Sequence, residues 1–250
     1  MQKEKPVDLT VKYKRREVED LLKRKFFVVP SFEIYGGVAG FFDFGPLGSA
    51  LKQAVEDKWR THFVLEEDML EVTTTNLIVH DVLKTSGHVD KFSDFMVKDV
   101  KTGAARRADK LIQEHIQKIL PKQKKQEDID RLERILMDSE NYNTEQIDAV
   151  IKELAIKDPD TGNDLSNATP FNLMFSNKIG PSGYMTGYLR PETAQGIFIN
   201  FRRLIEFNNG KMPFAAAQVG MGFRNEISPR QGLLRVREFT MAEIEHFVDP

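Results

Sequence analysis

An arginine, a glutamate and a phenylalanine near the end of the chain have a spacing that suits nucleotide binding. Arg224 and Glu226 follow a run of alternating small and apolar residues, and Phe239 lies in a second alternating run. The pattern predicts an antiparallel hairpin with strands 214–226 and 234–247 and a loop between them. A guanidinium holds phosphate oxygens in a planar fork, a carboxylate accepts from an amine, and an aromatic ring stacks on a planar base. The hairpin therefore fits a ligand with a phosphate, a planar base and an amine.

Side chains alternate between the two faces of a strand, which collects the polar residues of this hairpin on one face. On the first strand this face carries Ala216, Gln218, Gly220, Gly222, Arg224 and Glu226, and on the return strand Arg235, Arg237, Phe239, Met241, Glu243 and Glu245. The two glycines are expected to leave open space for a ligand. Alternating charged and apolar residues also fit a two-layer sheet with one solvated face, so the pattern alone leaves both interpretations open.

Other common nucleotide-binding motifs are absent from the sequence. No G-x-x-x-x-G-K-[ST] segment occurs, which argues against a P-loop protein. The glycine-rich segment 36–48 lacks the G-x-G-x-x-G spacing of a dinucleotide site. The five histidines are scattered without metal-ligand spacing, so we expect no protein-bound metal.

The composition is that of an ordinary soluble protein. Lys and Arg number 36 against 38 Asp and Glu, so any contact with nucleic acid must use a local basic patch. The chain has no cysteine, which excludes disulfides and thiol catalysis and suits a reducing compartment. No apolar run reaches membrane-spanning length, and the first residues lack the pattern of a signal peptide. We therefore expect a cytoplasmic protein without membrane contact.

Hydrophobic periodicity divides the chain into four parts. We expect a lead-in helix over 1–25, the first part of a catalytic domain over 26–96, a mostly helical insertion over 97–168, and the second part of that domain over 169–250. The alternative interpretation of the insertion is a solvated surface module with no specific function.

The same sequence patterns predict several individual helices, strands and turns. Apolar residues at steps of four predict a helix over 49–66, and β-branched residues predict a strand over 69–75. In the insertion, Asn143 with Gln146 three residues later predicts a capping box, and 158–164 reads as a cluster of turns.

The hairpin resembles motif 2 of the class II aminoacyl-tRNA synthetases. The resemblance rests on Phe223-Arg224-Asn225-Glu226 and on Arg235-Val236-Arg237-Glu238-Phe239. The surrounding segments FRNEISPR and REFTMAEIEHFVDP resemble the glycyl-tRNA synthetases of the eukaryotic and archaeal dimeric type in particular. The resemblance implies an α+β fold, in which an antiparallel sheet is flanked by helices.

The resemblance also implies roles for individual residues in binding ATP. Arg224 would contact the α-phosphate and act in catalysis, Glu226 would accept from the adenine amino group, and Phe239 would stack on the adenine ring. The remaining expected ATP contacts are Asn225, Arg235 and Val236.

A second segment resembles the loop that binds the amino acid in the glycyl enzymes. It runs from Leu189 to Gln195 and contains Glu192. Glu192 and Glu243 are the expected contacts of the glycine ammonium group. Before the resemblance is counted, Glu192 also reads as a surface carboxylate after a proline turn. His88, in a third family-like segment, is expected to have a structural or tRNA-side role.

The implied activity is that of a glycine–tRNA ligase: ATP activates glycine, which is then transferred to tRNA(Gly), with Mg²⁺ on the phosphates. A homodimer is implied through motif 1, which the region 49–75 resembles, although Val79-His80-Asp81 stands where the class pattern has a proline. No G-x-G-x-x-R segment of motif 3 follows. The expectation is therefore an N-terminal fragment that ends after motif 2, with an incomplete fold and weak or no activity alone.

A non-catalytic module of the same family is the competing hypothesis. Such a module would bind the tRNA acceptor stem through the insertion, or would only dimerise. The insertion carries a basic run at Lys118, Lys122, Lys124 and Lys125. A solvated helix end explains these lysines equally well.

Overall fold

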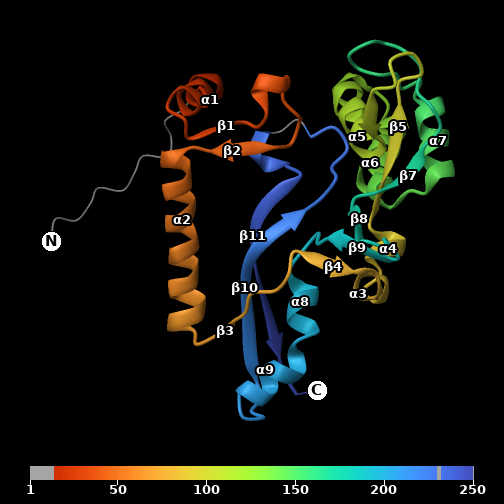
Figure 1. Ribbon diagram of the computed structural model, residues 1–250. Helices are drawn as coiled ribbons and strands as arrows, with labels where there is room; N and C mark the ends of the chain where they lie inside the picture. Colours follow the sequence, from red (N-terminus) through yellow and green to blue (C-terminus); the bar gives the residue numbers. More distant parts are fainter. Residues whose placement is uncertain (1–13, 230–231, 250) are drawn as a thin grey trace. The chain divides into compact units, whose positions relative to one another are not determined.

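The computed structural model describes residues 14–229 and 232–249, and the chain forms two compact units that divide between Asp68 and Met69 (Figure 1). Residues 1–13, the first half of the expected lead-in helix, lie outside the described part. Among the described residues, no helix is long and apolar enough to cross a membrane.

The first unit contains a long helix and a short two-stranded sheet. Its elements are α1 (Arg15–Arg24), β1 (Val28–Pro30), η1 (Glu33–Tyr35), β2 (Phe42–Phe44), α2 (Pro46–Arg60) and the π-helical turn η2 (Thr61–Glu66). The helix expected over 49–66 begins earlier, because Pro46 is well suited to the first helical turn. Gly48 is required there, since a Cβ would lie 1.9 Å from the carbonyl oxygen of Phe27.

The second unit is built around the expected hairpin. Strands β10 (Phe214–Phe223) and β11 (Glu238–Phe247) are antiparallel, and β3 (Leu70–Glu71) pairs in parallel with β10. Helices α8 (Ala194–Phe198) and α9 (Phe201–Phe207) lie along this sheet (Figure 1). Their Ile197 and Leu204 share a buried cluster with Phe214 and Ala216.

The register of the hairpin confirms the expected sorting of side chains. Gln218 pairs with Glu243, Gly220 with Met241, and Gly222 with Phe239. Directly paired residues of antiparallel strands share a face. Within the paired region the polar and glycine residues of both strands therefore lie on one face of the sheet, as predicted. Arg224, Glu226, Arg235 and Arg237, which the pattern assigned to the same face, lie outside the strands in the loop.

All three strands predicted in this part of the unit, over 214–226, 234–247 and 69–75, are shorter in the structure. The loop spans 224–237 because the backbone N–H of Asn225 turns away from the hairpin and donates to the carbonyl of Leu173. Of the strand expected over 69–75, only Leu70–Glu71 forms β3, and the backbone N–H of Val72 adds one further bond to the carbonyl of Ala217. The carbonyl groups of Thr74 and Thr75 instead accept hydrogen bonds from the side chain of Arg190.

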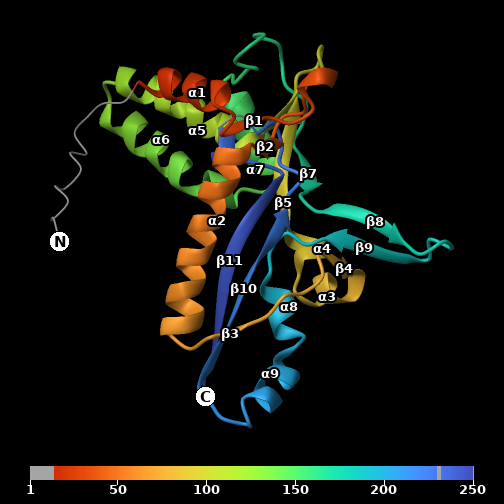
Figure 2. The ribbon, with the colours of Figure 1, turned by 60° about the vertical axis from the view of Figure 1, so that its left-hand side comes forward.

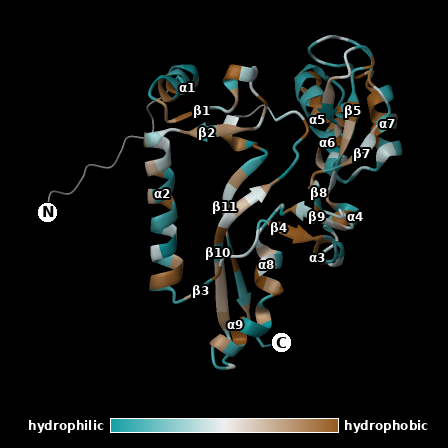
Figure 3. Ribbon diagram, viewed as in Figure 1, coloured by the Kyte–Doolittle hydropathy of each residue, from teal (hydrophilic) through white to brown (hydrophobic). Residues whose placement is uncertain are grey.

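A second three-stranded sheet lies beside the hairpin. It contains β4 (Leu77–Val79), β9 (Met185–Leu189) and β8 (Phe175–Ile179) in that order, followed along the chain from β4 by α3 (His80–Thr85) and α4 (His88–Lys91). Figure 2 shows β8 and β9 as a hairpin that extends beyond β4. Figure 3 shows β4 in the hydrophobic colour, and its central residue, Ile78, packs in a cluster with Leu83 and Met174.

Residues 93–172 have their own sheet and core, which extend past the expected insertion of 97–168 at both ends. Strands β6 (Ala105–Arg107), β5 (Ser93–Lys98) and β7 (Thr169–Asn172) form the sheet. The helices are α5 (Ala108–Ile119), α6 (Gln126–Asp138) and α7 (Thr144–Glu153), with the short turns η3 (Leu120–Lys122) and η4 (Ser139–Asn141). Ile112, Ile116 and Ile147 are completely buried between them. The capping box of Asn143 and Gln146 is confirmed.

Two turns with the same sequence pattern, D-x-x-T-G, hold one end of the insertion together. In each turn an aspartate, Asp99 or Asp158, accepts hydrogen bonds from the backbone N–H groups two and three residues later. Asp99 also accepts from the hydroxyl of Thr161 at 2.5 Å and from the amide of Asn163. Asp158 is held by Arg106 through two hydrogen bonds. Polar pairs therefore lock the two turns, which are 59 residues apart in the sequence, to one scaffold.

The first prediction concerns Asp99, which is 1% exposed. Hydrogen bonds, the largest from Thr161, hold the pKa of its carboxyl well below the usual value. A carboxyl with a lowered folded-state pKa stabilises the fold above its unfolded pKa, near 4, and this contribution is lost as the pH falls further. Asp99→Asn is therefore expected to lower the urea midpoint of unfolding at pH 7, and the difference from wild type is expected to shrink below pH 4.

Circular dichroism across a series of pH values measures this difference. Asp164→Asn is the matched control, because the Asp164 side chain is 76% exposed and pairs only with Lys157 among the ion pairs of the described residues. An Asp99→Asn protein with the wild-type midpoint at pH 7 would contradict the locking role of Asp99.

Candidate active site

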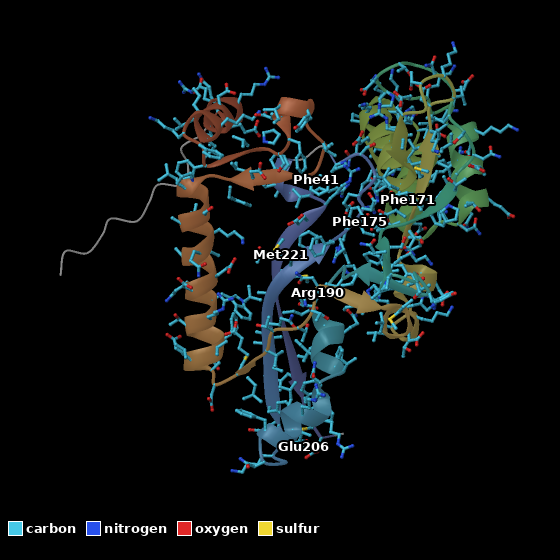
Figure 4. The ribbon with its side chains drawn as sticks, viewed as in Figure 1. Phe41, Phe171, Phe175, Arg190, Glu206 and Met221 are labelled. Carbon is cyan, nitrogen blue, oxygen red and sulfur yellow. The ribbon has the colours of Figure 1, made fainter. Side chains whose placement is uncertain are left out.

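A buried arginine forms the base of the candidate site. Arg190 is 1% exposed and donates from Nε to the carbonyl of Met221 on β10 at 2.8 Å, and Figure 4 shows the two residues near each other. Its Nη1 donates to the hydroxyl of Thr74 at 3.0 Å. Burial lowers the pKa of Arg190, and the nearby carboxylate of Glu243 partly offsets that change. Arg190 thus joins three segments that are distant in the sequence.

The glycines of the hairpin make room for the protein's own side chains, so the expectation of open space for a ligand was wrong. A Cβ at Gly220 would lie 2.2 Å from Nη2 of Arg190. A Cβ at Gly222 would lie 2.9 Å from the ring of Phe239. The glycines therefore act indirectly, because they let a guanidinium and an aromatic ring lie close to the backbone of β10.

Arg224 lies between two aromatic rings. Its guanidinium carbon is 5.4 Å from the centroid of the Phe239 ring and 5.6 Å from that of Phe92. Its Nε donates to the carbonyl of Pro191 at 3.1 Å, and its backbone N–H donates to the carbonyl of Arg237. These contacts fix the guanidinium beside the aromatic ring with which the sequence grouped it. Phe92 is a neighbour that the motif pattern did not indicate.

Glu226 is half-buried in the loop after β10. Burial is the largest cause that raises the pKa of its carboxyl, and the nearby Arg235 opposes this change. The Nε of Arg235 lies 4.0 Å from Oε2 of Glu226. This oxygen is buried and has no hydrogen-bond partner among the residues that the structure describes. Glu226 therefore offers an acceptor without a donor.

The other residues expected to contact ATP lie in the same loop. Asn225 is held by its backbone bond to Leu173, and Val236 is half-buried next to Arg237. Arg237 donates from Nη2 to the backbone carbonyl of Glu226 at 2.8 Å and so connects the two halves of the loop.

Glu192 lies in the turn before α8 and is fixed by two neighbours. Its Oε1 accepts from Nε2 of Gln195 at 2.7 Å and lies 3.3 Å from Nε2 of His88. The other ring nitrogen of His88 lies 2.9 Å from the hydroxyl of Ser86. The contact with Glu192 favours the structural alternative for His88 over a tRNA-side role.

Glu243 is connected to the same turn from the sheet. Its Oε2 accepts from the backbone N–H of Thr193 at 2.9 Å and from the hydroxyl of Thr193 at 2.6 Å. The two glutamates therefore flank one residue, Thr193, which is completely buried. A third carboxylate, Glu245, has its pKa raised by burial first and then by the charges of Glu243 and Glu192. The sequence placed Glu245 on this face without a role.

The family comparison agrees with this geometry. Residues 182–250 match the model of the tRNA synthetase class II core domain (G, H, P, S and T). The match covers the segment Leu189–Gln195 and the hairpin. Together with the helices and antiparallel sheets of the structure, it confirms the predicted α+β class II fold.

Curated relatives narrow the resemblance to one member of that class. The chain is 57% identical to a glycine–tRNA ligase of Caenorhabditis elegans over 95% of its own length and 32% of that protein. It is 54% identical to one of Drosophila melanogaster, with 96% of the chain and 32% of that protein covered. It is 44% identical to a glycine–tRNA ligase of Methanocaldococcus jannaschii, with 94% of the chain and 37% of that protein covered. The resemblance to glycyl-tRNA synthetases is confirmed, and the chain spans about a third of the length of these relatives.

Proposed function

We propose that this chain carries the ATP-binding and glycine-binding residues of a glycine–tRNA ligase of cytoplasmic translation. In the proposed reaction the carboxylate of glycine attacks the α-phosphorus of ATP, pyrophosphate leaves, and the glycyl group of glycyl-adenylate then passes to tRNA(Gly). The observation that supports this proposal most strongly is the hydrogen bond from Nε of Arg224 to the carbonyl of Pro191. This bond ties Arg224, the proposed phosphate contact, to the residue that precedes Glu192, the proposed ammonium contact.

Arg224 is the proposed catalytic residue. Negative charge builds up on the α-phosphate oxygens as the carboxylate attacks, and a fixed guanidinium stabilises that charge. The rings of Phe92 and Phe239 and the bond to Pro191 hold Arg224 in place before any substrate binds. A group that is already oriented loses little energy in reorganisation during the reaction.

The adenine contacts follow from Phe239 and Glu226. Edge atoms of the Phe239 ring lie beside Gly222, and the guanidinium carbon of Arg224 lies over the ring at 5.4 Å from its centroid. We propose that the adenine stacks on the face of the ring that Arg224 leaves open. The buried Oε2 of Glu226, which lacks a described partner, is the proposed acceptor for the adenine amino group. Asn225, Arg235 and Val236 are proposed to complete the ATP site.

Glycine offers an ammonium group, a carboxylate and no side chain. Glu192 and Glu243 are proposed to bind the ammonium group, since two carboxylates on either side of Thr193 suit a small cation. Exclusion of larger amino acids is then steric, and a closed pocket rejects a larger substrate more readily than a smaller one.

Magnesium is proposed to enter with ATP. Within the described residues, no group of three or more His, Cys, Asp or Glu side chains could hold a metal ion. Mg²⁺ usually binds through substrate phosphates and keeps several of its waters, so a protein cage is not required. When bound, it would neutralise phosphate charge beside Arg224.

The proposed macromolecular partners are tRNA(Gly) and a second copy of the chain. A pocket of about 320 Å³ beside the hairpin loop is lined by five basic residues, Arg106, Arg107, Lys110, Lys118 and Arg235, and by two acidic ones, Glu114 and Asp160. Its excess of positive charge supports contact with an RNA phosphate, although Arg106 and Arg107 are already paired with aspartates. Helix α2 exposes Leu47, Leu51 and Val55 in one apolar stripe, which supports the proposed homodimer through this region.

Glycine-dependent exchange between pyrophosphate and ATP tests the proposal on the full-length protein. Exchange that requires glycine, and that is lost in Arg224→Ala and in Glu192→Ala, is the expected result. Exchange that another amino acid supports equally well would reject the substrate. A folded protein without exchange that still binds an RNA acceptor stem would favour the non-catalytic alternative.

The second prediction concerns Phe239→Leu. Leucine still covers Gly222 but cannot stack on adenine, so the KM for ATP is expected to rise about tenfold while the KM for glycine stays the same. Phe207→Leu is the matched control, because Phe207 is 76% exposed on α9. The adenine contact is wrong if the exchange assay gives an unchanged KM for ATP.

A further inference from the structure

In both Glu192 and Glu243, one carboxylate oxygen receives all the hydrogen-bond and ion-pair contacts from the described residues, and the other receives none. Both contacts of Glu192, from Gln195 and from His88, reach Oε1. Both contacts of Glu243, from Thr193, reach Oε2. Among the residues that the structure describes, no hydrogen bond occupies the other oxygen of either carboxylate. Each glutamate is therefore held by one oxygen and keeps the second available.

Gln195 offers a third acceptor beside them. Only its NH₂ group can donate to a carboxylate, so the bond to Glu192 fixes which end of the amide is the carbonyl oxygen. Gln195 is 7% exposed, and its Oε1 is buried with no partner in the described part of the chain. Buried acceptors in native proteins are almost always satisfied, and an exception calls for a ligand, an ion or a water.

A glycine ammonium group has three N–H donors and needs three acceptors in a site without water. Glu192 and Glu243 supply one free oxygen each, and the carbonyl of Gln195 is attached to Glu192 through its own amide. We propose that Gln195 binds the substrate ammonium group as the third acceptor, and that it also positions Glu192. This inference rests on the proposed function and adds a specificity residue to it.

As a neutral third acceptor, Gln195 would affect which amines the site binds. A neutral amide carbonyl accepts an N–H but adds no further negative charge to a site that already holds Glu192, Glu243 and Glu245. A third carboxylate at that place would raise the repulsion among the acids. An amine with a methyl group in place of one N–H would leave the carbonyl of Gln195 without its donor.

Gln195→Leu tests the proposal in the exchange assay on the full-length protein. Leucine has nearly the same size and removes both the acceptor and the donor. The KM for glycine is expected to rise about 10- to 100-fold, the range for loss of a hydrogen bond to a charged group, while the KM for ATP stays within about twofold. Gln126→Leu is the matched control, because Gln126 is exposed on α6 and also donates to a carboxylate, that of Asp130.

N-methylglycine separates binding from positioning. The inhibition constants of N-methylglycine and the KM values for glycine are compared in the wild type and in Gln195→Leu. If Gln195 accepts from the ammonium group, the preference for glycine over N-methylglycine falls about tenfold in the variant. A residue that only orients Glu192 would weaken both ligands equally, and that result would overturn the proposal.

Two further outcomes are distinguishable. An unchanged KM for glycine in Gln195→Leu, with Glu192→Ala inactive, would overturn the inference and leave the proposed function standing. A folded wild-type protein without glycine-dependent exchange would remove the proposed function, and the inference with it.

Discussion

Arg224→Ala lowers the rate constant of glycine-dependent pyrophosphate exchange by about 100- to 1,000-fold, which is the cost of removing a fixed donor from a developing negative charge. The loss is expected mainly in kcat, since the charge on the α-phosphate grows during the attack. The KM values for ATP and glycine are expected to change much less, because Phe239, Glu226 and Glu192 remain in place.

Arg224→Lys separates the charge from the shape of the side chain. Lysine keeps the positive charge but loses the planar fork and the Nε–H that donates to Pro191, so we expect it to recover only a small part of the rate. Arg134→Ala, on the exposed face of α6, is the control. Equal losses in kcat for Arg134→Ala and Arg224→Ala, or a wild-type kcat in Arg224→Ala, would reject the catalytic assignment.

The face that carries the site was predictable because a strand has a period of two. Once Phe214 and Phe247 are aligned by the hairpin, alternation alone places Gln218 opposite Glu243 and Gly222 opposite Phe239. The grouping of Glu243 with Phe239 on one face required no long-range information. The capping box at Asn143 was predictable for the same reason, since both of its hydrogen bonds are local.

The contacts that complete the site were not predictable from local patterns. Charged side chains are rarely buried, yet Arg190 is buried because backbone carbonyls 31 and more than 100 residues away accept its hydrogen bonds. The length of the hairpin loop depends on the bond between Asn225 and Leu173. Such partners are distant in sequence, so no short-range rule links them.

The sequence correctly indicated that Gly220 and Gly222 matter for the site, but the predicted reason, open space for a ligand, was wrong. Open space above Gly220 and Gly222 was a sound expectation for a strand viewed alone. Arg190 comes from a loop before α8 and Phe239 from the partner strand, and both fill that space. Gly220 and Gly222 therefore lack a side chain so that Arg190 and Phe239 can pack against β10. A ligand on this face would contact such packed side chains and not the two glycines.

Arg190→Met is expected to lower the free energy of unfolding of the second unit by about 3 kcal/mol. Methionine fills much of the same volume but leaves the part-buried carbonyls of Met221, Thr74 and Thr75 without the donor that Arg190 supplies. A fully buried carbonyl left unsatisfied costs about 1–3 kcal/mol, so three part-buried carbonyls together give a loss of about that size, to which the loss of the charge near Glu243 adds. Arg202→Met, whose side chain is 90% exposed and pairs with Glu206, is expected to change stability by less than about 0.5 kcal/mol.

Urea unfolding followed by circular dichroism measures both variants. Trp59, the single tryptophan, lies in the first unit, so its fluorescence alone would not follow the unit that contains Arg190. Gly220→Ala provides a second route to the same contact, because its Cβ would meet Nη2 of Arg190. The double variant is then expected to be less destabilised than the sum of the two single variants, since both changes remove one interaction. Additive losses would show that Arg190 and Gly220 act independently and would contradict the packing described for the base of the site.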